Sequence, residues 1–158
     1  MVIIQHKDIT HNQILAIADV KSKVWDKYTF GEHITWINEN IKTNDYHVFL
    51  KNMEAYLNII NCKAEIDGRV NDLYGFGNLC AAHNGWAYGS MLMRKALLHF
   101  EGKFLSFCNI EYVNYYKHFD WQFAHKSKLD FPNIDLDQIY VMTYGFEFET
   151  LKYTGGKF

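Results

Sequence analysis

The sequence is poor in proline and in long apolar runs, and each shortage excludes a class of protein. A single proline in 158 residues excludes a proline-rich linker or a collagen-like segment. The longest apolar runs span only four or five residues, so we expect no membrane-spanning helix and no membrane partner. The first ten residues lack a cationic stretch followed by a long apolar one, so we also expect no signal peptide.

Basic charge is scarce as well. The chain has sixteen basic and eighteen acidic residues, which gives a formal net charge of −2, and its only arginines are Arg69 and Arg94. A nucleic-acid-binding protein usually presents a basic face with arginine forks for phosphate and guanine. The composition therefore predicts no nucleic-acid partner.

Cysteine and histidine show no metal-binding or disulfide pattern. The three cysteines, Cys62, Cys80 and Cys108, are odd in number and form no CxxC motif, which is typical of reduced thiols in a cytoplasmic protein. The eight histidines form neither an HExxH motif nor a cluster with cysteine. We therefore expect a cytoplasmic protein without a metal site.

Apolar and aromatic residues, in contrast, are abundant. Apolar types make up 49% of the chain and aromatic types 17%, enough to fill a core, which excludes a disordered chain. The length fits one domain over residues 1–158. Most aromatic side chains should line the core or a pocket wall, because each ring buries a large area.

Local patterns predict helices first and then strands. Thr10 and Gln13 form a capping-box pattern before apolar residues that recur at helical spacing as far as Trp25. Gly31 should break the chain before a second helix over His33–Ile41. Later segments predict strands over 46–51, 54–63, 72–80, 103–108 and 138–144, a hairpin turn at Asp67–Gly68 and a helix over 109–119. This order indicates a mixed α/β protein with an antiparallel start and a βαβ middle.

A short glycine-bearing segment follows the third strand of this series. Residues 81–90 are mostly small, and an apolar helical stretch begins at Met91. Such a loop can turn several backbone N–H groups toward one point at the positive end of the helix dipole. Glycine permits the close approach that a Cβ would block. The segment therefore predicts an anion site, with phosphate as the usual guest, although a plain strand-to-helix turn has the same pattern.

Two motifs in this order resemble the GNAT N-acetyltransferase superfamily. The stretch from Asn84 to Gly89 is similar to its acetyl-CoA loop, [Q/R]-x-x-G-x-[G/A]; the last glycine matches, whereas Asn84 and Ala87 depart from the pattern. The family's second motif is matched in spacing by Asn109, Tyr115-Tyr116 and Asp120-Trp121. Within the family, the segments 45–49 and 140–142 look most like the aminoglycoside 2′-N-acetyltransferase branch.

The resemblance implies a fold, a reaction and partners. The fold would be α/β (mixed α+β), with a central mixed, mostly antiparallel sheet flanked by helices. The reaction would move an acetyl group from acetyl-CoA, as co-substrate, to a primary amine of a small molecule by direct transfer in a ternary complex. It also allows a homodimer through the late strands, with the tail Gly145–Phe158 as an interface strand.

The same resemblance implies the site residues. Pantetheine would pair along the strand, whose N–H near Leu79 or Cys80 polarises the thioester carbonyl. Tyr116 would be the general acid, with Tyr115 as the alternative, and Asn109 would hold the pantetheine amide. The residues implied in cofactor binding are Leu79, Cys80, Ala81, Asn84, Gly85, Trp86, Ala87, Tyr88, Gly89, Ser90 and Asn109.

The general base is where the sequence departs most from the family. Many members carry a glutamate at the position that falls near Gly75 here, and glycine cannot act as a base. Asp72, Glu65 and Asp67 are the carboxylates within reach in sequence, and a water relay is the alternative. A polycationic acceptor would need a cleft lined by carboxylates, to which Asp26, Glu32, Asp45 and Asp72 are the candidates.

Other interpretations stay open at this point. Cys108 is either a thiol nucleophile or, in the absence of a nucleophile signature, a small buried hydrophobe. Trp86 either shields the cofactor or packs on the sheet edge. Met91 and Phe104 could line a slot for a longer acyl chain. The rival function is a non-catalytic module, either a degenerate GNAT domain that holds CoA or an aromatic-lined pocket for another small ligand.

Overall fold

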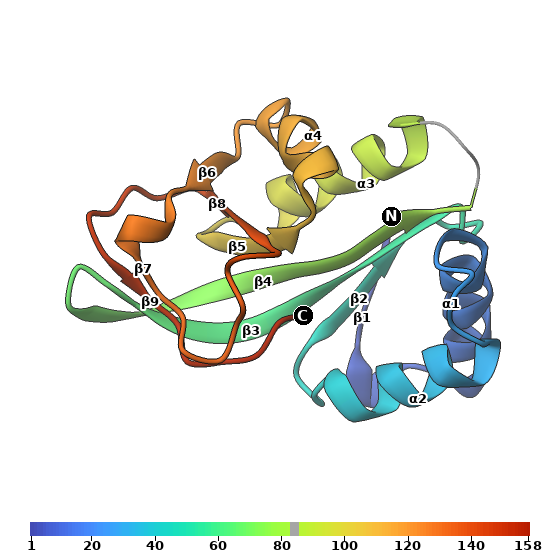
Figure 1. Ribbon diagram of the computed structural model, residues 1–158. Helices are drawn as coiled ribbons and strands as arrows, with labels where there is room; N and C mark the ends of the chain where they lie inside the picture. Colours follow the sequence, from blue (N-terminus) through green and yellow to red (C-terminus); the bar gives the residue numbers. More distant parts are fainter. Residues whose placement is uncertain (83–85) are drawn as a thin grey trace. The chain divides into compact units, whose positions relative to one another are not determined.

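The computed structural model describes residues 1–82 and 86–158, with Trp86 described in its backbone only. The chain divides into two compact units (Figure 1). The first unit comprises Met1–Ile60 and Gly77–Glu101, and the second comprises Asn61–Phe76 and Gly102–Phe158. Two long strands, β3 (Ala55–Ile66) and β4 (Arg69–Ala81), contribute residues to both units.

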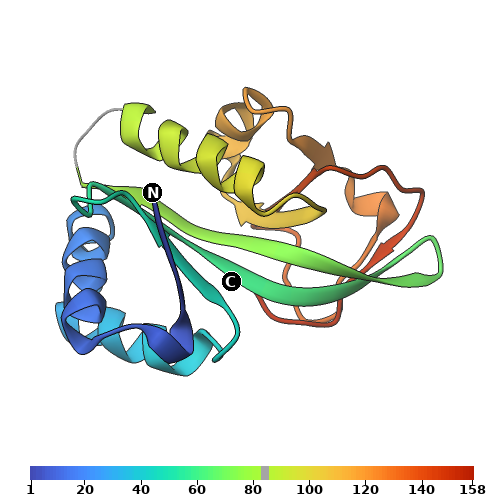
Figure 2. The same cartoon turned by 180° about the vertical axis from the view of Figure 1, so that it is seen from behind.

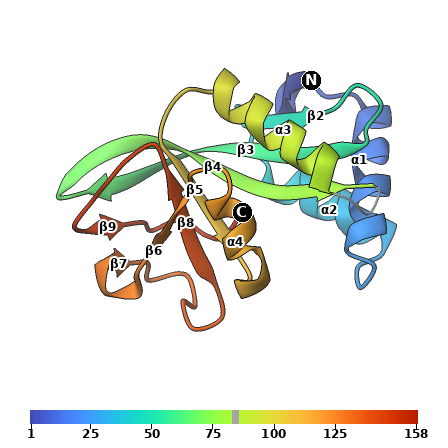
Figure 3. The same ribbon diagram turned by 90° about the horizontal axis from the view of Figure 1, so that it is seen from above.

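The first unit is a four-stranded sheet with helices on both faces. Its strands follow the order β1 (Val2–Gln5), β2 (Tyr46–Phe49), β3 and β4, with antiparallel pairing of β1 with β2 and of β2 with β3. In Figures 1, 2 and 3, two helices lie on one face of these strands and the third lies on the opposite face. The first two are α1 (His11–Val24) and α2 (Phe30–Asn40), and the third is α3 (Trp86–His99).

Capping boxes set the start of both N-terminal helices. The predicted box before α1 is confirmed: the Gln13 N–H donates to Thr10 Oγ1 at 3.3 Å, and the Thr10 N–H donates to Gln13 Oε1 at 2.9 Å. A second box, in which the Glu32 carboxylate accepts from the Thr29 N–H at 2.7 Å, starts α2 at Phe30. The prediction that Gly31 breaks the chain is therefore wrong, because these cap bonds hold Gly31 inside the first helical turn.

The predicted strands are confirmed; β3 and β4 are longer than expected, and the other three predicted strands are shorter. Asp67 and Gly68 form the expected hairpin turn with φ values of +48° and +79°, both in the left-handed region. Local patterns missed β1, β6 (Gln122–Ala124) and β7 (Leu129–Asp130), all of four residues or fewer. Strands this short carry too few residues for a clear alternation, and their pairing partners fix them instead.

The second unit is built around three strands and a short helix. β5 (Phe104–Cys108) runs parallel to β4, with Tyr74 opposite Phe104 and Gly75 opposite Leu105. It pairs antiparallel with β8 (Tyr140–Tyr144), which pairs in turn with β6. The segment after β5 forms a 3₁₀ turn and then α4 (Val113–Lys117), as expected for a helical segment. Across both units most pairings are antiparallel, which confirms the predicted α/β fold with a mixed sheet and flanking helices.

The C-terminal tail belongs to the core of the second unit. Its strand β9 (Leu151–Lys152) pairs with both β3 and β7. Leu151 is fully buried, and Tyr153 packs against Phe131 and Phe158 in the same apolar cluster. The tail thus completes the packing of its own unit.

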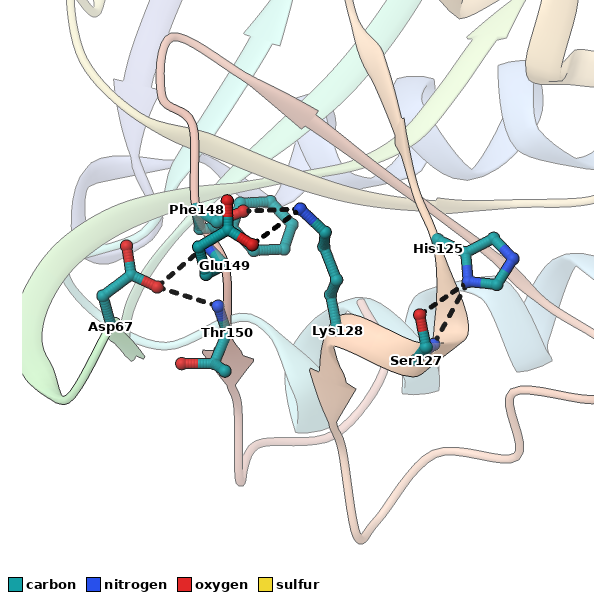
Figure 4. Close-up of polar contacts among 7 residues, drawn as sticks. All are labelled: Asp67, His125, Ser127, Lys128, Phe148, Glu149 and Thr150. Carbon is teal, nitrogen blue, oxygen red and sulfur yellow. Dashed lines mark hydrogen bonds and ion pairs between the residues drawn. The ribbon is translucent and has the colours of Figure 1, made fainter.

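Asp67 fastens the β3–β4 hairpin to this tail (Figure 4). Its Oδ1 accepts the backbone N–H of Thr150 at 2.8 Å and that of Glu149 at 2.9 Å. These bonds, first that from Thr150, lower the pKa of the Asp67 carboxyl, since they favour its charged form. A carboxylate bonded in this way is a weak proton acceptor, which disfavours Asp67 as a general base.

We expect Asp67→Ala to lower the Tm at pH 7, because two backbone N–H groups lose their acceptor. Asp67→Asn, which tolerates the left-handed turn but lacks the charge, should have an intermediate Tm. The folded-state pKa is lowered, so the charge stabilises the fold above the unfolded pKa, and this contribution is lost as pH falls below about 4. Thermal melts against pH test this, with Asp72→Ala, at an exposed ion pair, as the control. Equal melting of Asp67→Ala and wild type at pH 7 would contradict the assignment.

Candidate functional site

The strand predicted to bind the cofactor forms the end of β4. Leu79, Cys80 and Ala81 are its last three residues; Cys80 is buried and its two neighbours are half-buried. Asn78, directly before them, has a φ of +52°, which is in the left-handed region. A single left-handed residue bends a strand and redirects the residues that follow, as in a β-bulge. The backbone of Leu79–Ala81 is therefore set by the turn at Asn78.

The helix after this strand begins earlier than predicted. α3 starts at Trp86 rather than at Met91, so Ala87, Tyr88, Gly89 and Ser90 are helical and not loop residues. Asn84, Gly85 and the side chain of Trp86 lie outside the described residues. The first turn of α3 carries no acidic residue, and the backbone N–H groups of a first turn have no intrahelical acceptor. This end of α3 is thus electrostatically suited to an anion.

Tyr116, the predicted general acid, is buried in the second unit. Its hydroxyl lies 3.0 Å from Ser106 Oγ, which in turn lies 2.7 Å from the carbonyl oxygen of Phe76. A serine hydroxyl has one hydrogen and a carbonyl only accepts, so Ser106 donates to Phe76 and the Tyr116 O–H donates to Ser106. Burial raises the pKa of Tyr116 well above its ordinary value. The phenol keeps the proton that a general acid must give at neutral pH, as any tyrosine does, but burial makes it a weaker acid.

The neighbours of Tyr116 differ from it in exposure. Tyr115 is half-buried and packs edge-on against both Tyr116 and Phe119. Asn109 follows β5 directly and is exposed; its carbonyl accepts the Tyr112 N–H at 3.0 Å, and its side chain makes no cap hydrogen bond. Among the described residues, the exposed side-chain amide of Asn109 is therefore available to bind another group.

The position of the family's glutamate has no room for a side chain. A Cβ on Gly75 would lie 2.5 Å from the ring of Phe158. Of the alternative carboxylates, Asp72 forms an exposed ion pair with Lys63 at 3.1 Å, and Asp67 binds the tail as described above. Glu65 is half-buried on β3. Gly75 is therefore a packing position, where a ring replaces the carboxylate.

A buried polar cluster in the first unit escaped the sequence analysis. The ammonium group of Lys21, on α1, donates to Asn78 Oδ1 at 3.1 Å, and Asn78 Nδ2 donates to Asn58 Oδ1 at 2.8 Å. Lys21 is only 2% exposed and Asn58 is fully buried. One signal was available: Lys21 stands four residues after Ile17, on the apolar face of the predicted helix, where a lysine is unexpected.

Histidines and thiols near this cluster are uncharged. His47 lies 2.8 Å from His6 Nδ1 through its Nε2 and 2.9 Å from the Tyr56 hydroxyl through its Nδ1. Burial lowers the pKa of His47 to about 3 and raises that of the Cys80 thiol to about 12. In the second unit, burial likewise raises the pKa of the Cys108 thiol to about 12, which favours the interpretation of Cys108 as a small buried hydrophobe. Lys21 therefore carries a positive charge beside neutral histidines and a neutral thiol.

Within residues 1–82 and 86–158, no group of three or more His, Cys, Asp or Glu side chains could hold a metal ion. No helix in that part of the chain has both the length and the hydropathy to cross a lipid bilayer. All three cysteines are free thiols.

Solved structures with a similar fold are known, although no sequence match is found. No family model and no curated protein sequence matches the chain. Among solved structures, it is similar to an acyl-CoA N-acyltransferase from Pseudomonas aeruginosa (TM-score 0.64, 16% identity, 91% of this chain and 97% of that one). It is also similar to Escherichia coli ElaA (TM-score 0.59, 15% identity, 91% of this chain and 97% of that one). A third similar structure is a GNAT family acetyltransferase from Brucella melitensis in complex with acetyl-CoA (TM-score 0.57, 14% identity, 97% of this chain and 95% of that one). The chain therefore has the fold of GNAT acyltransferases.

Proposed function

We propose that the protein is an acyl-CoA-dependent N-acetyltransferase that transfers an acetyl group to a primary amine of a small molecule. The observation that carries the proposal is the end of β4. There, a left-handed Asn78 precedes Leu79–Ala81, and the chain continues into α3, whose first turn has no acidic residue. A solved structure of the same fold contains acetyl-CoA, which supports an acyl-CoA ligand here.

In this proposal the backbone does most of the binding. Leu79, Cys80 and Ala81 pair with pantetheine as an added strand would, and the N–H of Leu79 or Cys80 polarises the thioester carbonyl. The pyrophosphate lies on backbone N–H groups of the first turn of α3, over residues 86–90. The exposed amide of Asn109 binds the pantetheine amide.

The chemistry then needs little from side chains. The neutral amine attacks the thioester carbonyl carbon, a C–N bond forms, and the C–S bond of the tetrahedral intermediate breaks. The leaving thiolate takes a proton from Tyr116, while the proton of the amine leaves through water, since Phe158 fills the place of a base at Gly75. No covalent enzyme intermediate forms.

The acceptor is proposed as a small amine and not as a polycation. An aminoglycoside is the narrower acceptor that the sequence resemblance suggests, and it needs a carboxylate-lined site. Two of the four candidate carboxylates already have structural partners: Glu32 caps α2, and Asp45 is buried and accepts the Lys42 N–H at 2.8 Å. A small amine of low charge fits these facts better.

One observation favours a second candidate, a non-catalytic CoA-binding module. The glutamate position at Gly75 is filled by the ring of Phe158, so a carboxylate base cannot be placed there without moving that ring. A domain that binds acyl-CoA without turnover would tolerate this change. Turnover with a primary amine separates the two candidates.

Titration with acetyl-CoA in a thermal-shift assay tests the binding half of the proposal. A ligand at about 100 times its Kd stabilises the folded state by roughly 2.7 kcal/mol, so a specific site produces a clear, saturating rise in Tm. Free pantetheine and ADP, each carrying one part of the ligand, should give smaller shifts. An unchanged Tm with acetyl-CoA and with longer acyl-CoAs would contradict both candidate functions.

A further inference from the structure

Three energetically unfavourable features meet at Asn78 in β4. Its backbone is left-handed, which is uncommon for a residue with a side chain. Its side chain is bonded to the ammonium of Lys21, which is 2% exposed. Its other partner, Asn58, is fully buried, and Asn58 Nδ2 has no hydrogen-bond acceptor among the described residues. Such costs gather where a local conformation is retained for function.

The environment of Lys21 compensates its burial without a carboxylate. Its ammonium lies 4.0 Å from the centroid of the Trp36 ring and 5.7 Å from that of Trp25, so two indole rings face the charge. No described carboxylate forms an ion pair with it. Burial lowers the pKa of Lys21 to about 8, which leaves it mostly protonated at pH 7. Among the described residues, the Lys21 ammonium donates its hydrogen bond to Asn78 Oδ1.

The bonds to Asn78 act on both ends of its amide. Lys21 donates to the oxygen from α1, and the nitrogen donates to Asn58 on β3. With both ends held, the side chain has one orientation, and the left-handed backbone beneath it is held as well. The next residues along the chain are Leu79–Ala81, the segment proposed to bind acyl-CoA.

We propose that Lys21 is a positioning residue that, through Asn78, holds the turn of β4 and so orients the backbone N–H groups of Leu79–Ala81 toward acyl-CoA. This inference rests on the proposed function, because it assigns a role in that same site. Lys21, in α1 and far from the motifs in sequence, is thereby a determinant of acyl-CoA affinity.

A double-mutant cycle tests the inference, with the Kd of acetyl-CoA measured by calorimetry on folded protein. Lys21→Met keeps the length of the side chain but removes the charge and the donor, and should weaken binding roughly tenfold. Asn78→Gly permits a left-handed backbone but removes both bonds that hold it, so this variant should weaken binding at least as much as Lys21→Met. On the Asn78→Gly background, Lys21→Met should not weaken binding further, because the hydrogen bond between Lys21 and the residue 78 side chain is already absent. Lys23→Met, at an exposed lysine of the same helix, is the control.

Each other outcome is decisive. Wild-type affinity in Lys21→Met, or an equal loss from Lys21→Met on both backgrounds, would overturn the inference while leaving the proposed function intact. If Lys21→Met does not fold, Asn78→Gly decides: it loses the bonds to Lys21 and Asn58 without straining the left-handed backbone, so it should weaken binding. Wild-type affinity in Asn78→Gly overturns the inference. Absence of acetyl-CoA binding by wild type would remove the proposed function and this inference together.

Discussion

Ala87→Glu is expected to weaken acetyl-CoA binding at least tenfold, by about 1.4 kcal/mol or more, without lowering the Tm. Ala87 is exposed in the first turn of α3, which has no acidic residue. A glutamate there interacts favourably with the positive end of the helix dipole, so it stabilises the helix. The same charge repels the pyrophosphate that we place on this turn. Stability and affinity should therefore change in opposite directions, which general damage to the fold cannot produce.

Leu98→Glu supplies the matched control for this variant. Leu98 lies near the other end of α3 and is 78% exposed, so the same charge is added to the same helix away from the proposed site. Its acetyl-CoA affinity, measured by calorimetry, should equal that of wild type. Unchanged affinity in Ala87→Glu would show that the start of α3 does not bind the cofactor. Gly89 is less suitable for this test, because it is buried and a larger side chain there would disturb packing.

Tyr116→Phe is expected to lower kcat roughly 100-fold while leaving the Kd of acetyl-CoA unchanged, since general acid catalysis contributes about 10²–10⁴-fold. The substitution removes only the hydroxyl, and Ser106 keeps its bond to the Phe76 carbonyl. We expect about 1 kcal/mol of lost stability from the missing hydrogen bond, so the protein stays folded. Steady-state thiol release gives kcat, and calorimetry gives the Kd.

The adjacent tyrosine is the control for this substitution. Tyr115 is half-buried and packs against Tyr116, so Tyr115→Phe changes the same aromatic cluster without touching the bond to Ser106. Tyr115→Phe should retain turnover. If Tyr116→Phe lowers the Tm but retains kcat, Tyr116 is structural. If only Tyr115→Phe loses turnover, the general acid is Tyr115.

Local signals in the sequence predicted much of the fold. The Thr10–Gln13 capping box and the Asp67–Gly68 turn each depend on residues within four positions, and both form as expected. The start of α2 was also encoded locally, in Thr29 and Glu32, but this capping box was missed and a break was predicted at Gly31 instead. Four-residue β1 was missed because its partner β2 lies some forty residues further along the chain.

The polar cluster of the first unit shows what local patterns cannot reveal. Lys21, Asn58 and Asn78 come from α1, β3 and β4, and the bond between Lys21 and Asn78 joins residues 57 positions apart. Asn58 and Asn78 alone are ordinary for a surface, and only the tertiary structure shows that they are held together with Lys21, with Lys21 and Asn58 almost fully buried. In the same way, the glycine at position 75 suggested a missing base, but not that Phe158 fills its place.

The central claim is acetyl transfer, and the most direct measurement is product formation from acetyl-CoA and a panel of small primary amines. Free thiol release and the mass of the amine product would be followed together, with Ala87→Glu as the impaired variant. We predict equal amounts of CoA thiol and N-acetylated amine with at least one acceptor, no acetylated enzyme, and a much lower rate in the variant. Saturable binding of acetyl-CoA with no thiol release for any amine would contradict the claim and identify the protein as a CoA-binding module.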